Sequence, residues 1–391
     1  MNEIEIMNKI HFHVKRCGTI IMVAILVLFL GACNTNTSKD AATNINEPSY
    51  YDIEYHRGGR DARPENTLYS YQYAIESGAS TIECDMQMSA DGQIVMSHNA
   101  VLNPDITIDS NGNRIEANKY YIHDMTYEEL QEFNVGSMDE SCEYYDMHGR
   151  SQVQHKASIP TLRQVFELVR DSGNVNVRLS IEAKYMPDPA AGTLYEKNYD
   201  KDEMLTKFKS LVEEFGFKDR VQLQSFDWDI LKRMEEIDPE FITVALYNEQ
   251  ASWGGVDSMT LWLDKDDPSP WLGGIDIKDF GKDPFKAAAF LGFDIVSPYY
   301  EELTKAQVEF AHKNGMKVIP WTINSKQDME IMYKMKVDGM ITDKPWVLRE
   351  FLESKGEKLP TPMKTSLPYH LDPDHLEAEE IETEGGKDAA Y

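Results

Sequence analysis

The amino-acid sequence predicts an α/β fold, a TIM (β/α)8 barrel with insertions on its loop face and a disordered acidic tail at its C-terminus. Eight short apolar segments have the composition of buried strands, and amphipathic helical segments lie between most of them. This alternation favours parallel strands joined by helical crossovers, and eight parallel strands close a barrel. An open, doubly wound sheet is the alternative fold.

Residues 1–32 have the pattern of an export signal peptide. Basic residues precede an uncharged run over residues 20–32, which is shorter than the ~20 residues of a membrane span. The run ends with the letters LGAC at residues 30–33, which resemble the lipobox of bacterial lipoproteins. We therefore expect Cys33 to be lipidated and residues 33–49 to form a flexible tether. The protein would then be exported as a membrane-anchored lipoprotein on the extracytoplasmic side, at the cell surface or in the periplasm. An ordinary cleaved signal or an uncleaved anchor is the alternative.

The predicted barrel spans residues 50–355, and its elements follow one another in a regular order. The strand candidates are rich in β-branched and aromatic residues and lie at residues 52–56, 81–87, 176–183, 220–225, 242–247, 293–298, 316–321 and 338–342. The helix candidates have amphipathic spacing and lie at residues 66–77, 161–171, 203–215, 227–237, 304–314 and 326–335. Thr161, Asp227 and Thr304 are suited to cap the helices that begin at them.

Two segments depart from this order, and we expect both to be insertions on the loop face of the barrel. The first, about residues 102–158, contains one short helix candidate at residues 126–133. The second, about residues 252–289, contains three tryptophans and lies where the fifth helix is expected. Beyond the barrel, residues 356–391 form an acidic tail that we expect to be mobile.

The composition limits the partners of the chain. Its 391 residues include 39 Lys and Arg against 67 Asp and Glu, which gives a formal net charge of −28. A nucleic acid needs a basic surface, so we expect no nucleic-acid partner. The hydrophobic fraction of 41% excludes a chain that is disordered throughout. Only Cys84 and Cys142 lie in the predicted barrel and its insertions, and we expect a buried free thiol at Cys84 rather than a disulfide framework.

Acidic residues lie at the ends of two predicted strands. Glu83 and Asp85 are two residues apart, so both side chains point to one face of their strand, and Glu182 lies near the end of the third strand. Each of them alone is more typical of a solvent-facing edge. In a barrel, however, these strand ends meet at one rim, where three carboxylates would repel one another unless a cation lay between them. Oxygen ligands of this kind suit Ca²⁺ or Mg²⁺ rather than Zn²⁺.

Titratable and basic residues also lie at the ends of predicted strands or just after an apolar run. His56 and Arg57 lie at the end of the first predicted strand. His98 follows a short apolar run, and Lys184 follows the end of the third strand. Two imidazoles can serve as acid and base near neutral pH, and two cationic side chains can neutralise a phosphate. Together with a carboxylate-bound cation, this set is suited to metal-assisted cleavage of a phosphodiester.

Short motifs at and between these residues occur in one order along the chain. They read HRGG at 56–59, PENTL at 64–68, ECD at 83–85, DG at 91–92, H at 98, IPTL at 159–162, EAK at 182–184, QSF at 224–226 and IPWT at 319–322. In this order they resemble the glycerophosphodiester phosphodiesterase family, whose fold is a TIM barrel. The resemblance runs from about residue 53 to residue 349 and omits the two irregular segments.

The resemblance also implies what individual residues do. In that family, one divalent cation, two histidines and two basic residues act together on the phosphodiester of a small-molecule substrate. By position, the implied cation ligands are Glu83, Asp85 and Glu182, the implied acid/base pair is His56 and His98, the implied phosphate contacts are Arg57 and Lys184, and the implied pocket residues are Glu65 and Trp321.

One position departs from the family pattern. The family usually has an aspartate after the second histidine, whereas Asn99 follows His98 here. An amide can orient an imidazole by a hydrogen bond, but it stabilises the charged ring less than a carboxylate does. The departure can therefore alter activity, although the rest of the set is complete.

The sequence thus predicts an enzyme, a glycerophosphodiester phosphodiesterase that uses Ca²⁺ or Mg²⁺ to release sn-glycerol 3-phosphate and an alcohol. A related barrel enzyme that cleaves intact lipids, a phospholipase of the phosphatidylinositol-specific or sphingomyelinase D type, is one alternative, because the Tyr- and Trp-containing insertions can supply an apolar rim. A surface lipoprotein that binds a phosphodiester or a glycan without cutting it is the other. The presence of three carboxylates and two histidines argues against the second alternative.

Overall fold

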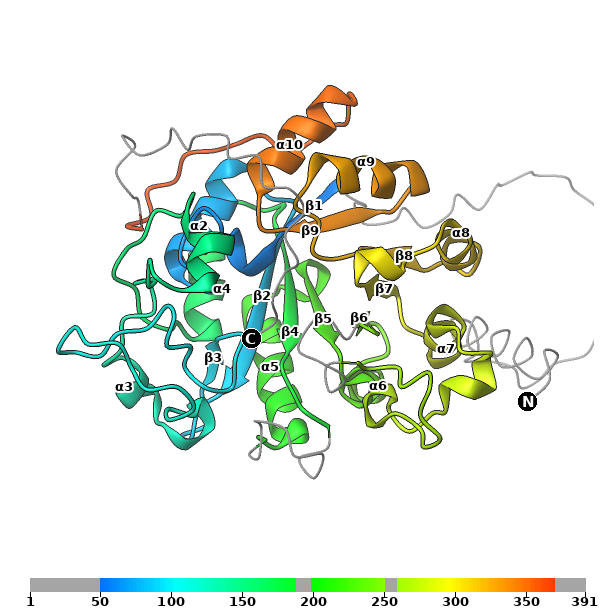
Figure 1. Ribbon diagram of the computed structural model, residues 1–391, viewed down its shortest axis with the longest axis horizontal. Coiled ribbons are helices and arrows are strands. Elements are labelled where there is room, and N and C mark those ends of the chain that lie inside the picture. Colours follow the sequence, from blue (N-terminus) through cyan, green and yellow to red (C-terminus); the bar gives the residue numbers. More distant parts are fainter. Residues whose placement is uncertain (1–49, 188–197, 250–258, 370–391) are drawn as a thin grey trace, which may run out of the picture. The chain divides into compact units, whose positions relative to one another are not determined.

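The computed structural model describes residues 50–187, 198–249 and 259–369, and the strands in these residues form a nearly closed barrel with helices around it (Figure 1). Within the described residues, no helix is both long enough and apolar enough to cross a membrane. The predicted signal peptide, the tether and the lipidation site Cys33 lie outside the described residues, as does the tail from residue 370 onward.

The barrel strands are hydrogen-bonded in the order β8-β7-β6-β5-β4-β2-β1-β9, and all neighbours in this order are parallel. Asp338 N donates to Val318 O (2.9 Å) and Ile341 N donates to Pro320 O (3.1 Å), which links the two ends of the order. The predicted barrel is therefore confirmed, and the open sheet is wrong. The bounds of the strands are β1 Asp52–Tyr55, β2 Thr81–Met88, β3 Ile94–Met96, which pairs antiparallel with β2, β4 Arg178–Ala183, β5 Val221–Ser225, β6 Ile242–Tyr247, β7 Ile295–Pro298, β8 Lys317–Val318 and β9 Gly339–Thr342.

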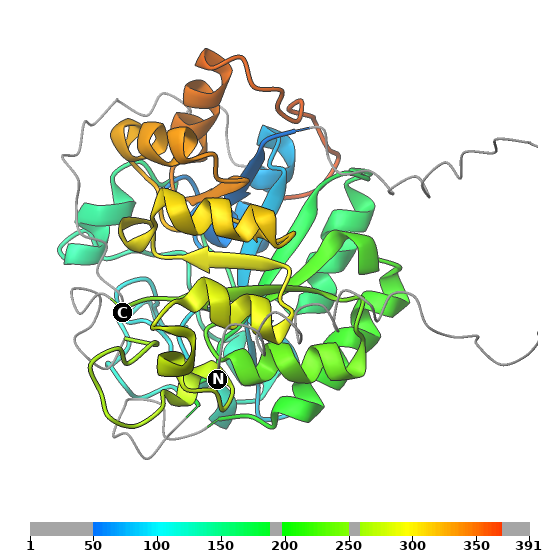
Figure 2. The ribbon, with the colours of Figure 1, turned by 90° about the vertical axis from the view of Figure 1, so that its right-hand side faces the viewer.

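Helices cover the outside of the strands (Figure 2). Thr161, Asp227 and Thr304 cap α4, α6 and α8 through their side-chain oxygens, as predicted. The α-helices are α2 Leu68–Ser77, α3 Tyr127–Leu130, α4 Leu162–Asp171, α5 Lys201–Phe215, α6 Trp228–Ile237, α7 Pro284–Leu291, α8 Lys305–Lys313, α9 Lys326–Met335 and α10 Pro345–Ser354. The shorter helical turns are η2 His56–Gly58, η3 Ile122–Asp124, η4 Tyr145–Gly149, which is a π turn, η6 Lys218–Arg220, η9 Pro270–Leu272, η10 Ile277–Phe280 and η11 Tyr300–Glu302.

Three elements differ from the prediction. Helix α7 lies largely inside the segment that we expect to be irregular, because Asp283 caps it and Pro284 suits its first turn. Helix α10 is not predicted, and its first turn has no side-chain cap that would mark it in the sequence. Strand β8 has only two residues, although Trp321 N still donates to Pro298 O (3.1 Å) beyond the end of the strand.

Successive side chains of each strand point alternately to the helices and to the barrel interior. The side chains that face the helices form an outer core. Ile82, Cys84 and Met86 of β2 belong to the outer core between strands and helices, and the thiol of Cys84 is free, as predicted. In the interior, β1, β2, β4 and β5 present buried polar side chains. The opposite half of the interior is an apolar cluster of Val244, Leu246, Ile295, Tyr299, Ile319, Trp321 and Ile341. The predicted cation ligands Glu83, Asp85 and Glu182 lie in the polar half.

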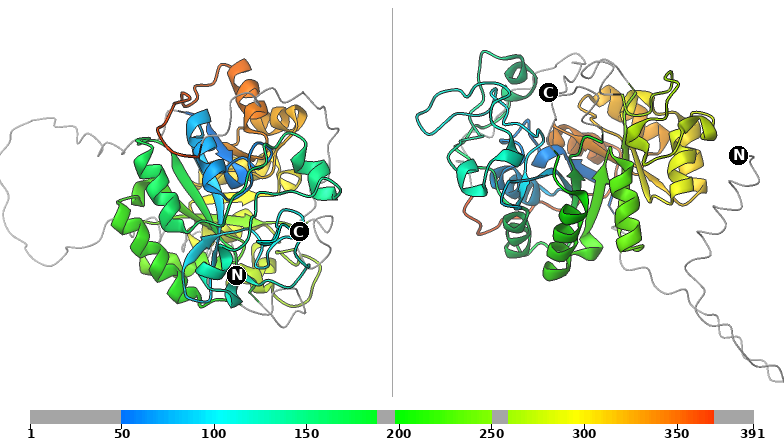
Figure 3. Two further views of the ribbon diagram at one scale, coloured as in Figure 1. Left: turned by 90° about the vertical axis from the view of Figure 1, so that its left-hand side faces the viewer. Right: turned by 90° about the horizontal axis from the view of Figure 1, so that it is seen from below.

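The first predicted insertion contributes most of a small apolar core that also includes Val95 of β3. The chain of this insertion lies at one side of the barrel (Figure 3, right). It also contacts the loop after β1, where Val153 N donates to Ala62 O (3.1 Å) and Gln152 Nε2 donates to Arg60 O (2.6 Å). The buried residues of this core are Val95, Leu102, Ile115, Ile122, Leu130, Phe133, Val135 and Ile159.

The described part of the predicted tail differs from a free segment. Met363 N donates to Glu76 O (2.9 Å) and Tyr369 N donates to Gln72 Oε1 (2.9 Å), so this part of the chain follows helix α2. Leu367 is buried against the outer core. The tail is therefore attached to the barrel up to residue 369, and the mobility of the acidic residues beyond it stays a prediction outside the described residues.

Candidate active site

Three carboxylates meet near the carboxyl ends of β2 and β4. Parallel pairing places Asp85 beside Glu182, and Glu83 lies two residues earlier on β2 and on the same face. One oxygen from each of these side chains lies within 4.8 Å of an oxygen of the others, and all three residues are buried. The structure thus brings together the three residues that the sequence predicts as cation ligands.

Neighbouring donors satisfy most of the oxygens of Glu83 and Asp85. Gln224 Nε2 donates to Glu83 Oε1 (2.7 Å), and Arg57 N donates to Glu83 Oε2 (2.8 Å). Asn66 Nδ2 donates to Asp85 Oδ2 (2.8 Å). Asp85 Oδ1, in contrast, is buried without a hydrogen bond and faces Lys184 Nζ at 3.6 Å. A buried oxygen held only by such an ion pair can take a bound cation as a further partner. This oxygen and the all-oxygen ligand set fit a divalent cation.

Burial and mutual repulsion change the protonation of the carboxylates. Burial, and then the charge of Asp85, raises the pKa of Glu83 well above its ordinary value. Burial raises the pKa of Glu182 to about 7, with Lys184 opposing and Asp85 adding to the effect. Burial works against ionisation of Asp85 too, but His98 and the nearby cationic side chains lower its pKa below the ordinary value. The two glutamates therefore bind protons more tightly than exposed glutamates do, and a bound cation would displace those protons.

His56 lies directly after β1 and is oriented by a carboxylate. Its Nδ1 lies 2.6 Å from Asp343 Oδ1, and its Nε2 lies 3.9 Å from Glu83 Oε2. Burial alone would raise the pKa of Asp343, but Arg60 and His56 lower it well below its ordinary value, so this carboxylate accepts and Nδ1 donates. Burial lowers the pKa of His56 to about 4, with Asp343 opposing, so the ring is neutral near pH 7. Its Nε2 is then free to accept a proton on the side of the carboxylates.

His98 follows β3 and lies on the wall of a pocket. Its Nδ1 lies 2.6 Å from Asn99 Oδ1, so the amide orients the ring. Burial, and then the charge of Arg57, lowers the pKa of His98 well below its ordinary value. The pocket is lined by Gln87, His98, Ala100, His123, Glu182, Lys184, Tyr185, Met186, Asn198, Tyr199, Phe226 and Trp271.

The two predicted phosphate contacts flank the carboxylates. Arg57 Nε lies 3.5 Å from Asp85 Oδ2, and Arg57 Nη1 donates to Glu65 Oε1 (2.9 Å). Lys184 Nζ lies 2.9 Å from Glu182 Oε1 and 3.6 Å from Asp85 Oδ1. An anion at this cluster would therefore meet two positive side chains, one of them a guanidinium suited to paired hydrogen bonds.

The two predicted pocket residues lie behind other groups, and neither is among the residues that line the pocket beside His98. Glu65 is buried and supports Arg57. Trp321 belongs to the apolar half of the interior, and its ring centroid lies 5.4 Å from that of Phe226, a residue of the pocket wall. Substrate contact by either residue stays a prediction.

Residues 56–347 match the Glycerophosphoryl diester phosphodiesterase family. The chain belongs to this family. A glycerophosphodiester phosphodiesterase of Caldanaerobacter subterraneus subsp. tengcongensis is 28% identical over 301 residues, which cover 77% of this chain and 97% of the relative. One from Bacillus altitudinis is 26% identical over 294 residues, which cover 74% of this chain and 93% of the relative. The crystal structure of a Silicibacter pomeroyi protein described as a glycerophosphoryl diester phosphodiesterase matches with a TM-score of 0.66 at 26% identity, covering 79% of this chain and 95% of that one. The predicted family and enzyme class are confirmed.

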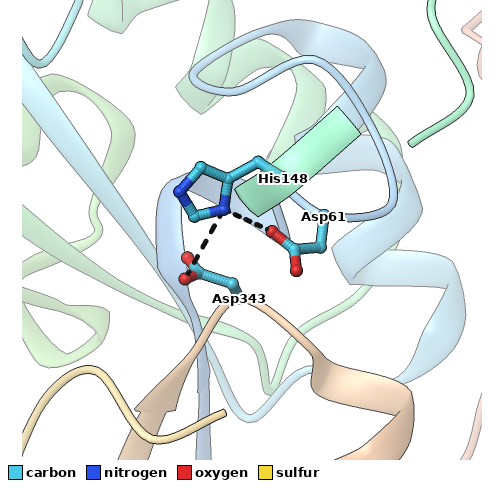
Figure 4. Close-up of side chains that lie close together, drawn as sticks. All are labelled: Asp61, His148 and Asp343. Atoms are coloured by element: carbon cyan, nitrogen blue, oxygen red, sulfur yellow. Dashed lines mark hydrogen bonds and ion pairs between the residues drawn. The ribbon is translucent and has the colours of Figure 1, made fainter. Parts of the chain in front are cut away.

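This member of the Glycerophosphoryl diester phosphodiesterase family also contains a buried cluster that the sequence analysis does not predict. His148 Nδ1 lies 2.7 Å from Asp61 Oδ1 and 4.0 Å from Asp343 Oδ2 (Figure 4). These three residues are close enough to hold a metal ion. Arg60, however, already donates to both oxygens of Asp343, from Nε (2.6 Å) and from Nη2 (3.0 Å). Because a guanidinium occupies both oxygens of Asp343, whereas Asp85 Oδ1 accepts no hydrogen bond, the cluster on β2 and β4 is the better cation site.

Some residues near the site are not predicted from the sequence, and only one of them carries a local sequence signal. Asp343 directly follows the last strand, β9, so the positional rule that selects the other site residues also applies to it. His148 lies in the irregular segment 102–158, where no spacing of the sequence relates it to a strand end. Only the folded chain brings it to the loop after β1.

Proposed function

We propose that the chain hydrolyses a glycerophosphodiester to sn-glycerol 3-phosphate and an alcohol, with Ca²⁺ or Mg²⁺ as its cation. The observation that carries the proposal is a buried cluster of three carboxylates in which Asp85 Oδ1 accepts no hydrogen bond. Histidine and cationic side chains surround this cluster, as cleavage of a phosphodiester requires. Membership of the family supports the choice of substrate class.

The charged residues would act on the phosphate. A cation held by Glu83, Asp85 and Glu182 would supply Lewis-acid polarisation of a phosphoryl oxygen. Arg57 and Lys184 neutralise the remaining charge of the phosphate and hold it against the cluster. This arrangement favours the more highly charged transition state over the bound substrate.

The two histidines would transfer the protons. One imidazole accepts the proton of the attacking oxygen, and the other donates a proton to the leaving alcohol. Asp343 keeps the proton of His56 on Nδ1, so that Nε2 can accept. Asn99 fixes the ring of His98 in the same way, although without a charge.

An assay of product release tests the proposal. The purified protein is incubated with glycerophosphocholine, and sn-glycerol 3-phosphate is measured before and after treatment with EDTA and again after Ca²⁺ or Mg²⁺ is restored. We expect release that EDTA stops and a divalent cation restores. Cleavage of vesicle lipids alone would indicate the phospholipase alternative. Release from no substrate in a panel of glycerophosphodiesters would indicate the binding protein and refute the proposal.

We further propose that the chain is exported and anchored on the extracytoplasmic side of a membrane by a lipid on Cys33. The LGAC letters at residues 30–33, after the uncharged run, support this proposal. To test it, bacteria that express the full chain are labelled with radioactive palmitate. Label should be lost in Cys33→Ala and kept in the control Cys142→Ala, and equal label in both would refute a lipid at this cysteine.

A further inference from the structure

The hydroxyl of Tyr144 joins two arginines and a glutamate behind the site. Its oxygen accepts hydrogen bonds from Arg60 Nη1 (3.2 Å) and from Arg57 Nη1 (3.5 Å). The same hydroxyl donates to Glu65 Oε2. A phenol has one donor and two lone pairs, so these three partners use its whole capacity. Because Tyr144 is buried, water cannot replace the hydroxyl without rearrangement.

The two arginines that contact Tyr144 reach different parts of the site, one beside Asp85 and the other beside Asp343. Arg57 lies beside Asp85 and is the guanidinium that the proposed function assigns to the phosphate. Arg60 holds Asp343 from Nε and Nη2, and Asp343 in turn accepts from His56. One hydroxyl thus connects the phosphate-binding guanidinium with the carboxylate that orients a histidine.

The insertion holds the ring of Tyr144 rigidly. Tyr144 directly precedes the π turn η4, and its ring centroid lies 4.8 Å from that of His148, which is itself paired with Asp61. The guanidinium of Arg60 lies 5.9 Å from the centre of the Tyr144 ring. Ser151 Oγ donates to Asp61 O (2.9 Å), which fixes the chain after the turn to the loop after β1. The hydroxyl is therefore presented by a folded segment.

We propose that Tyr144 is a positioning residue, which sets the guanidinium of Arg57 for the phosphate of the substrate. This inference rests on the proposed function, because it assigns the phosphate to Arg57. Without the hydroxyl, Arg57 keeps Glu65 and Asp85 as partners but loses the third group that fixes the rotation of its guanidinium. The guanidinium would then spend less time in the orientation that binds a phosphate.

The variant Tyr144→Phe removes the hydroxyl and keeps the ring. The matched control is Tyr127→Phe, a residue of the same segment whose hydroxyl donates to Gln164 of α4 (2.9 Å). With glycerophosphocholine as substrate, we expect kcat/KM of Tyr144→Phe to fall by about 10–100-fold. The KM and the inhibition constant of sn-glycerol 3-phosphate should both rise, and the control should match the wild type. A loss of folded protein alone would lower kcat and leave both constants unchanged, and that result would refute the inference.

A double-mutant cycle with Arg57→Lys separates positioning through Arg57 from an independent effect. Lysine cannot offer the paired donors that Tyr144 is proposed to orient. In the Arg57→Lys background, the further change Tyr144→Phe should therefore alter kcat/KM by no more than about 2-fold, which is within the usual additivity error. If the double variant instead lost kcat/KM by the product of the two single losses, Tyr144 would not act through Arg57.

Binding of inorganic phosphate separates this inference from the proposed function. Calorimetric titration in the presence of Ca²⁺ needs no turnover, so it gives an answer even if glycerophosphocholine is not cleaved. We expect Tyr144→Phe to bind phosphate about 10-fold or more weakly than the wild type and the Tyr127→Phe control. Equal affinity in all three proteins, or no phosphate binding by the wild type, would overturn the role of Tyr144.

Discussion

The two histidines of the site have different partners, and the difference has a chemical consequence. His56 donates to the ionised carboxylate of Asp343, whereas His98 faces the amide of Asn99. A carboxylate stabilises a positively charged ring more than an amide does. In the proposed mechanism, His56 therefore gains more support than His98 when its ring takes up a proton.

Replacing either histidine should remove most activity. We expect His56→Ala and His98→Ala each to lower kcat by about 10²–10⁴-fold, the usual contribution of a general acid or base. The control is His312→Ala, an exposed histidine of α8 that lies 2.9 Å from Asp338. Steady-state kinetics on folded protein, verified by circular dichroism, measures the effect. A rate like that of the wild type in either site variant would exclude that imidazole from proton transfer.

At this scale, sequence reasoning finds the residues that we propose to act in the reaction and misses the residues that hold them in place. Glu83, Asp85 and Glu182 carry charge at strand ends, which is a local signal. The role of Asn66, whose amide holds Asp85, depends on a contact across 19 positions. The contact of Tyr144 with Glu65 spans 79 positions in an irregular segment. Such partners become visible only when the chain is folded.

The loop between β1 and helix α2 determines how the site is held. It contains Glu65 and Asn66, which contact Arg57 and Asp85, and it ends at Thr67, the N-cap of α2. Asn66 has a φ of 53°, a left-handed conformation that asparagine tolerates better than most residues. The start of one helix and the geometry of the proposed cation site are therefore coupled.

Removing the cap of α2 should affect stability and cation binding together. Thr67 accepts from Ser70 N and also donates to Pro64 O (2.7 Å), so Thr67→Ala should lower the free energy of unfolding by about 1–2 kcal/mol. The matched control is Thr304→Ala, which removes the same kind of cap from α8. Urea unfolding should show a loss of about 1 kcal/mol for the control.

Only Thr67→Ala should weaken the affinity for Ca²⁺ or Mg²⁺, because the adjacent Asn66 then loses its fixed position beside Asp85. Calorimetric titration of the cation into each protein measures this difference. An equal cation affinity in Thr67→Ala, Thr304→Ala and the wild type would show that the cap of α2 does not affect cation binding.

Elements with regular periodicity are predictable, and those shaped by long-range packing are not. The strands that support the site are predicted within a few residues, because β-branched runs and caps are local signals. Helix α7 is obscured by the irregular chain before it, and β8 is shortened where the ladder ends at Val318. The bound segment near Leu367 is missed because its acidic surroundings resemble a free tail.

The barrel interior as a whole is divided into a polar half and an apolar half, and the polar half concentrates negative charge. Besides the site, it contains Glu54, whose pKa is raised well above its ordinary value by burial and then by Asp52. Buried acidic groups of this kind oppose folding unless protons or cations neutralise them. The stability of the whole molecule should therefore depend on pH and on divalent cations at the same time.

The cation should stabilise the protein more at pH 8 than at pH 5. Without a cation, Glu182 has a pKa of about 7 in the folded state against 4.5 as its ordinary value, so its contribution to stability is present below pH 4.5 and is lost as pH rises through 7. A cation at about 100 times its Kd restores about 2.7 kcal/mol at pH 8. At pH 5 the proton on Glu182 competes and weakens the apparent affinity by about 100-fold, so the gain falls below about 0.5 kcal/mol.

Thermal unfolding with EDTA or with Ca²⁺ at both pH values measures this gain, and two variants locate its source. Glu182→Gln should abolish the response to the cation at either pH. Glu235 also has a pKa raised to about 7 by burial, but it contacts Thr243 (3.1 Å) rather than the carboxylate cluster. Glu235→Gln should therefore reduce the dependence of stability on pH and leave the response to Ca²⁺ unchanged. A gain of equal size at pH 5 and pH 8 would mean that the cation binds away from Glu182, because only a shared site makes proton and cation compete.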